Sequence, residues 1–154
     1  MSRQTKRCIK FGSFVLLTLY IAVLIYVCFF SEDYGRDVIT SYYRYNLIPF
    51  KEIRRFYIYR DVVGIRAFLA NLFGNVLAFM PYGFFMPILR PKLRRMNRMF
   101  LAAFLLSLTI EITQLLTRVG SFDVDDLILN TSGGIIGYLL FYIINKVRRK
   151  WNGA

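Results

Sequence analysis

Isolated polar side chains within long apolar stretches are the residues with which this chain could do chemistry. Glu111 is the single charged residue between 99 and 117, and Gln114 and Arg118 follow on the same helix face. An ionisable group inside a membrane is costly and is by default a candidate for function. Glu111 could contact a ligand or act as a general acid or base. The structural alternative is an ion pair between Glu111 and Arg118 or another arginine.

Three aspartates lie directly before the last apolar stretch: Asp123, Asp125 and Asp126. Carboxylates at the start of a helix accept hydrogen bonds from its free N–H groups and interact favourably with its dipole. Such capping accounts for one or two of these acids, but not for three beside Arg118. We expect no metal, although in an enzyme the three carboxylates could hold a divalent cation. Glu111 and Asp126 would then be the catalytic residues. Asn130 follows on the same helix face as Asp126.

Two asparagines, Asn71 and Asn75, lie four residues apart and therefore on one face of a helix. Amides at such positions could contact a ligand, or could join helices by hydrogen bonds worth about a kcal/mol each. Pro81 follows in the same stretch, removes a backbone donor and predicts a kink.

Two glycines further along the chain, Gly133 and Gly137, have the small-xxx-small spacing that lets helices approach closely. We interpret them first as residues that pack helices together. The same spacing also predicts a homo-oligomer formed through Gly133 and Gly137.

Four stretches are long and apolar enough to hold these side chains inside a membrane: residues 11–30, 67–89, 99–117 and 127–144. Three of them have no charge, and the other has Glu111 alone. A membrane-spanning helix needs about 20 mostly apolar residues. The first stretch is longer than the apolar region of a secretory signal, roughly 7–15 residues, and no small-x-small cleavage site follows it. It predicts a retained first span.

The net charge of +12, from 21 Lys and Arg against 9 Asp and Glu, indicates the orientation of these spans. A hydrophobic fraction of 56% is too high for a soluble basic domain, so we expect no nucleic-acid partner. Segments 1–10, 90–98 and 145–154 together carry +13, whereas segments 31–66 and 118–126 sum to zero. Positive charge is enriched on the cytoplasmic side of membrane proteins. The sequence predicts an all-α integral membrane bundle of four transmembrane helices with both termini cytoplasmic.

The long outer segment, residues 31–66, is rich in aromatic and basic side chains. Within 51–60, apolar residues recur at helical spacing, which predicts a short helix lying in the outer headgroup region, where Tyr is enriched. Arg44 and Asn46 in this segment are candidate contacts for the phosphate or sugar of a headgroup. The alternative interpretation is a disordered outer loop.

The absence of His excludes the catalytic and metal sites that depend on an imidazole. Within this chain there can be no Ser-His-Asp triad, no HExxH zinc site and no haem His ligand. The two cysteines, Cys8 and Cys28, lie near opposite ends of the first predicted span and are too far apart to bridge. We expect no cofactor, and an enzyme of this kind would depend on carboxylates, arginines and metal at most.

The candidate residues segregate toward one side of the predicted bundle. Nine of them, from three helices and one loop, fall in the outer third of the membrane or on its outer surface: Asn71, Asn75, Glu111, Gln114, Arg118, Asp123, Asp125, Asp126 and Asn130. The inner halves of the same helices have almost no polar residues. This segregation predicts a polar pocket that opens outward, with Arg44 and Asn46 as further ligand contacts.

These residues also resemble the motifs of the VanZ-like family, over about residues 40–145 and in the family's order. The motifs are Asn46-Leu-Ile-Pro-Phe50, Asn71 with Gly-Asn75-Val-Leu-Ala-Phe-Met-Pro81-Tyr-Gly83, Glu111-x-x-Gln114, Phe122-Asp-Val-Asp-Asp126 and Asn130-Thr-x-Gly-Gly134-x-x-Gly137. The resemblance implies a small multi-pass protein of the bacterial plasma membrane. The family's founding member is associated with resistance to teicoplanin, a glycopeptide that acts outside the cell on lipid-linked cell-wall precursors.

Three functions stay open on the sequence alone. The one we favour is a non-catalytic envelope protein whose outer pocket binds a membrane lipid, a lipid-linked cell-wall component or the glycopeptide itself, and so lowers glycopeptide susceptibility. The second is a His-free membrane enzyme that modifies a lipid-linked envelope substrate by carboxylate catalysis, with or without a divalent metal. The third is a scaffold whose polar face pairs with another membrane protein.

Overall fold

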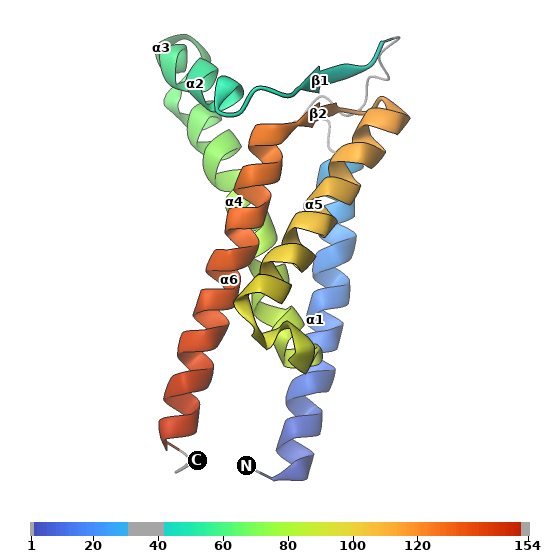
Figure 1. Ribbon diagram of the computed structural model, residues 1–154, viewed down its shortest axis with the longest axis vertical. Coiled ribbons are helices and arrows are strands. Elements are labelled where there is room, and N and C mark those ends of the chain that lie inside the picture. The colour runs from blue at the N-terminus through green and yellow to red at the C-terminus, as the bar shows by residue number, and fades with distance from the viewer. Residues whose placement is uncertain (1, 31–41, 152–154) are drawn as a thin grey trace.

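The computed structural model describes residues 2–30 and 42–151, and four long helices dominate it (Figure 1). The elements in chain order are α1 (Arg3–Phe29), β1 (Arg44–Asn46), α2 (Lys51–Ile58), α3 (Arg60–Val63), α4 (Ile65–Leu89), η2 (Pro91–Arg94), α5 (Met96–Thr117), β2 (Ser121–Asp123) and α6 (Val124–Trp151). Part of the predicted outer segment, residues 31–41, lies outside the described residues.

The four long helices confirm the four predicted spans. Residues 3–29, 68–89, 96–117 and 124–151 are each long and apolar enough to cross a membrane. The helices extend past the apolar stretches, most clearly at the basic ends of α1 and α6. Hydropathy limits only the part of a helix that lies in lipid, whereas each further residue adds a backbone hydrogen bond to a helix already formed.

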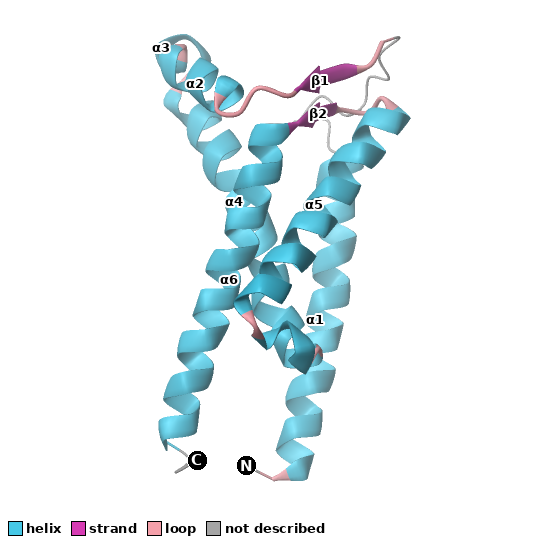
Figure 2. Ribbon diagram, in the orientation of Figure 1, coloured by secondary structure: helices cyan, strands magenta, loops and turns pink. Residues whose placement is uncertain are grey.

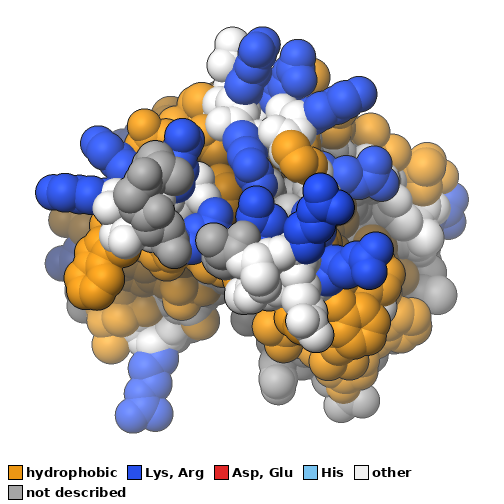
Figure 3. Space-filling view, turned by 90° about the horizontal axis from the view of Figure 1, so that it is seen from below, with side chains coloured by type: hydrophobic (Ala, Val, Ile, Leu, Met, Phe, Trp, Pro, Cys, Tyr) orange, Lys and Arg blue, Asp and Glu red, His pale blue; other side chains and the backbone are white. Residues whose placement is uncertain are grey.

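The molecule has two chemically different ends. Both termini lie at one end, which we call the terminal end, and β1, β2, α2 and α3 lie at the opposite end, which we call the sheet end (Figure 1). Seen from the terminal end, Lys and Arg side chains gather over the surface, and no Asp or Glu is visible among the described residues on this face (Figure 3). By the positive-inside rule, the terminal end is predicted to be cytoplasmic.

Helices α4 and α6 form the most intimate contact in the bundle, and glycines make it possible. A methyl group on Gly83 would lie 1.8 Å from the backbone oxygen of Gly134, and one on Gly137 would lie 1.9 Å from that of Met80. Gly133 likewise faces the backbone of Val76. The expected role of Gly133 and Gly137 in helix packing is confirmed within the chain. Helix α4 of the same chain occupies this surface of α6, and the homo-oligomer through the two glycines stays a prediction.

Helix α4 continues through both of its prolines, Pro81 and Pro87. Proline interrupts the backbone hydrogen bonds of a helix, and neighbouring helices can bond to the carbonyls of that region. The Tyr20 hydroxyl of α1 donates to the Ala78 carbonyl at 2.6 Å, three residues before Pro81. Arg94 donates to the Pro87 carbonyl at 3.0 Å. These contacts anchor the interrupted part of α4 to its surroundings.

A two-stranded parallel sheet at the sheet end is absent from the sequence-based prediction (Figure 2). It pairs Arg44 with Ser121 and Asn46 with Asp123, and so joins the segment before α2 to the connection between α5 and α6. Each strand has three residues, too few for a periodic pattern to be seen in the sequence. The expected helix within 51–60 is confirmed as α2, so residues 51–58 are not a disordered loop.

Candidate functional site

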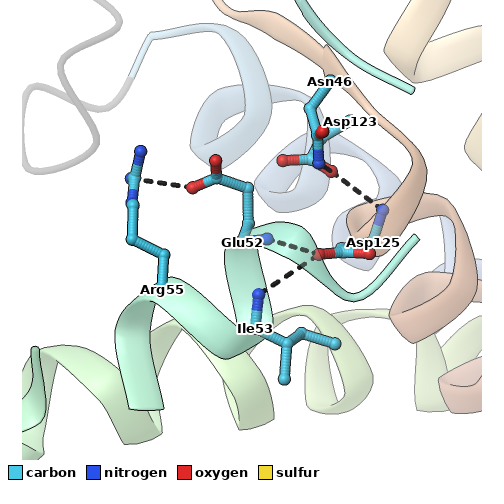
Figure 4. Close-up of polar contacts among 6 residues, drawn as sticks. All are labelled: Asn46, Glu52, Ile53, Arg55, Asp123 and Asp125. Carbon is cyan, nitrogen blue, oxygen red and sulfur yellow. Dashed lines mark hydrogen bonds and ion pairs between the residues drawn. The ribbon is translucent and has the colours of Figure 1, made fainter. Parts of the chain in front are cut away.

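Asp125 caps a helix that lies more than 70 residues earlier in the chain. Its carboxylate accepts hydrogen bonds from the backbone N–H groups of Glu52 at 2.8 Å and Ile53 at 3.2 Å (Figure 4). It also accepts one from the backbone N–H of Phe50. Phe50 has a left-handed backbone and makes no side-chain cap of its own. Asp125 is 1% exposed. Its charge is therefore held by the free N–H groups and the dipole of α2.

Asp123 joins the sheet to the start of α6. Its carboxylate accepts a hydrogen bond from the Asn46 side chain at 3.0 Å and another from the backbone N–H of Asp125 at 2.8 Å. The second bond caps α6 in the way expected for an acid just before a helix. Asn46 in turn accepts a bond from the backbone N–H of Ile48 at 3.2 Å. Burial raises the pKa of Asp123 above its ordinary value, and these hydrogen bonds oppose the rise.

Glu111 lies directly beneath this network. Its Oε2 atom accepts a hydrogen bond from the backbone N–H of Asp123 at 2.9 Å, and the side chain is 2% exposed. Glu111 is six residues before the end of α5 at Thr117, about 9 Å along the helix axis. The contact of Arg118 is with Tyr43, where its guanidinium lies 4.6 Å from the ring centroid.

A small cavity lies below the network, where four helices meet. It has a volume of about 60 Å³, and its polar lining residues come from α4, α5 and α6: Asn75, Glu111, Gln114, Asp126 and Asn130. Asn75 donates to the Asp126 carboxylate at 2.5 Å. A water molecule needs about 10–15 Å³ of such volume, so the cavity admits a few waters or an ion and no sugar.

Two further residues that line the cavity form hydrogen bonds to neighbouring helices. Gln114 donates to the Cys28 carbonyl at the end of α1 at 2.9 Å. Asn130 donates to the Ser107 hydroxyl of α5 at 3.0 Å. The Oδ1 atom of Asn130 is buried and has no hydrogen-bond partner among the described residues. Ser107 is absent from the candidates named in the sequence analysis, although a serine four residues before Glu111 lies on the same helix face.

A second pocket opens at the sheet end, above the network. It has a volume of about 270 Å³ and is lined by basic, acidic and neutral polar side chains: Arg44, Tyr45, Asn46, Lys51, Glu52, Arg55, Ser121 and Asp123. Figure 4 shows Arg55 paired with Glu52, at 2.7 Å, beside Asn46 and Asp123. Sequence reasoning missed Lys51 and Arg55, whose i,i+4 spacing on the predicted helix was the available signal.

The predicted residues therefore divide between two sites. Five of them line the cavity, and Arg44, Asn46 and Asp123 line the sheet-end pocket. Asn71 lines neither of these two sites, and Arg118 packs on Tyr43. Asp123, Asp125 and Asp126 accept hydrogen bonds from different partners. The described residues contain no group of three or more acidic or Cys side chains placed to hold a metal ion.

Comparison with known proteins identifies the family of the chain. The family model VanZ/LLP1 matches residues 17–145. The chain is 30% identical to Protein VanZ of Enterococcus faecium over 133 residues. The aligned region covers 85% of this chain and 74% of that protein. No solved structure matches. With this match over most of its length, and with four helices able to cross a membrane, the chain belongs to the VanZ/LLP1 family of multi-pass bacterial membrane proteins.

Proposed function

We propose that the sheet-end pocket binds the anionic headgroup of a membrane lipid or lipid-linked cell-wall component, and that this binding lowers susceptibility to glycopeptides such as teicoplanin. The observation that carries the proposal is the gathering of Arg44, Lys51 and Arg55 around one pocket at the end of the bundle opposite the basic terminal end. The protein acts as a binding protein, with the sheet end facing the cell exterior.

The charges of the pocket support an anionic ligand. Within the described residues, Arg55 is the partner of Glu52, while Arg44 and Lys51 have no ion pair with an acidic side chain. Arginine can bind a phosphate through two parallel hydrogen bonds, and lysine adds a compact positive charge. The neutral polar groups of Tyr45, Asn46 and Ser121 suit the hydroxyl groups of a headgroup or sugar.

The size of the pocket supports a headgroup rather than a whole glycopeptide. Small-molecule pockets commonly have volumes of roughly 300–1,000 Å³, and this pocket has about 270 Å³. A phosphate or diphosphate with part of a sugar fits that space. The lipid tail would lie along the apolar surfaces of the helices, where side chains such as Leu69 and Phe73 of α4 are exposed.

The test removes the two positive charges that have no acidic partner in the described chain. We expect an Arg44→Gln/Lys51→Gln double variant, present in the membrane at the wild-type level, to lose most of the protein's effect on the minimal inhibitory concentration of teicoplanin. The matched control is Lys92→Gln/Arg95→Gln at the terminal end, which should keep the wild-type effect. A double variant that protects cells as well as the wild type overturns the proposed site.

One observation favours the enzyme as a second candidate. Glu111 and Asp126 line the same cavity, so two carboxylates that could act as acid and base share one site. Mass spectrometry of membrane lipids and wall precursors, with and without the protein, separates the two candidates. A new or missing species that depends on Glu111, tested as Glu111→Gln, supports the enzyme. An unchanged lipid profile with altered glycopeptide susceptibility supports the binding protein.

A further inference from the structure

We propose that the cavity between α4, α5 and α6 is a binding site for a single divalent cation held by oxygen ligands, with Glu111, Asp126 and Asn130 as its protein ligands. This inference is independent of the headgroup site, because the cavity and the sheet-end pocket share no lining residue. It also differs from the aspartate triad considered from the sequence, of which only Asp126 lines the cavity.

The lining of the cavity has the ligand chemistry of a hard cation. Two carboxylates, Glu111 and Asp126, and three side-chain amides face it, and no Lys or Arg is among its described lining residues. Calcium takes carboxylate, amide and water oxygens in a flexible geometry, and two carboxylates balance its charge. The volume of about 60 Å³ holds one such ion together with coordinated water.

The buried amide of Asn130 is the independent observation that points to a ligand. Asn130 is 4% exposed, and its Nδ2 atom donates to Ser107, which fixes the amide. Its Oδ1 atom has no hydrogen-bond partner among the described residues, although a buried carbonyl oxygen without one is destabilising. A cation in the cavity would satisfy this oxygen.

Each of the two carboxylates accepts a hydrogen bond from a neutral donor, which orients the acid. Glu111 accepts a hydrogen bond from the backbone N–H of Asp123 on one of its oxygens, Oε2. Asp126 accepts one from Asn75 on Oδ1. Such contacts resemble the outer contacts that orient metal-binding carboxylates. A bound cation would therefore link the inner ends of this network on α4, α5 and α6.

The experiment measures binding of calcium to the full-length protein in detergent. After treatment with a chelator, equilibrium dialysis with ⁴⁵Ca²⁺ should give one site per chain, and CaCl₂ should raise the unfolding temperature until the site saturates. The Asp126→Asn and Glu111→Gln variants should each weaken binding by at least about tenfold, because each removes a charged ligand. Asn130→Ala should also weaken it.

The control variant is Glu52→Gln, which removes a carboxylate outside the cavity and should bind calcium like the wild type. MgCl₂ is tested in the same way, and saturable one-site binding of either divalent ion supports the proposal. NaCl at matched ionic strength should not reproduce the effect. No binding, stabilisation by NaCl equal to that by CaCl₂, or unchanged binding in Asp126→Asn would overturn the site. Size-exclusion profiles establish that each variant is folded before binding is compared.

Discussion

The carboxylate of Asp125 accepts a hydrogen bond from the backbone N–H of Glu52 at 2.8 Å, and this contact joins the start of α6 to the start of α2. The same residue is 1% exposed and also binds the N–H of Ile53. Because α2 carries Lys51 and Arg55, Asp125 positions two of the basic side chains of the sheet-end pocket without lining it.

Replacing Asp125 with alanine should release α2 and destabilise the protein. We expect the free energy of unfolding to fall by about 2–3 kcal/mol, because three N–H groups lose a buried charged acceptor. Thermal unfolding in detergent measures the change. The control is Arg55→Ala, which removes the ion pair with Glu52 and the contact of the guanidinium with the Phe56 ring, and should cost about 1 kcal/mol. Equal effects of the two variants would contradict the capping role.

A methyl group at Gly137 should separate α4 from α6. In Gly137→Ala the added atom would lie 1.9 Å from the Met80 carbonyl oxygen, so the helices must shift, and we expect a loss of about 1–3 kcal/mol or more. Gly12→Ala on α1 is the matched control, since nothing lies within 4 Å of its added methyl group. That change should stabilise the helix by up to about 1 kcal/mol. Unfolding curves that move equally would refute the close contact.

The titration of Asp123 should make stability depend on pH. Burial raises its pKa above the ordinary 3.8, and repulsion by the carboxylates of Asp125 and Glu52 adds to the rise. The folded protein thus holds this proton more tightly than the unfolded chain does. The stability that Asp123 contributes is complete below pH 3.8 and is lost as the pH rises through the raised pKa.

The variant Asp123→Asn isolates this effect, because an asparagine oxygen can still accept both hydrogen bonds but cannot titrate. We expect the unfolding temperature of the wild type, relative to that of the variant, to fall as the pH rises from below 3.8 toward neutrality. A difference that stays constant over this range would show that Asp123 does not titrate abnormally.

The predicted orientation can be checked with single cysteines at the two ends of the bundle. In a background with Cys8→Ser and Cys28→Ser, a cysteine replacing Val62, which is 83% exposed in α3, should react with a membrane-impermeant maleimide on intact cells. One that replaces the exposed Lys92 should react only after permeabilisation. Equal labelling at both positions would exclude the orientation.

The sequence named most of the residues that line the two sites, but it placed them in a single pocket. Membership of the cavity followed from helical spacing, because residues three or four apart, such as Glu111 and Gln114, share a face wherever the helix packs. The hydrogen-bond partners of the three aspartates were harder to predict from the sequence. Asp123 caps its own helix, as spacing predicts, but Asp125 caps α2 and Asp126 binds Asn75, and neither partner is near in sequence.

The sequence by itself determined the four spans, since lipid demands long runs of apolar residues with internally bonded backbones. The charge of the connecting segments likewise predicted which end would be basic. Only the tertiary structure decided that Arg44 pairs with Ser121 in a short parallel sheet, and that Gly137 packs against the backbone of α4. Those contacts depend on how helices and loops distant in sequence are brought together, and no local period encodes them.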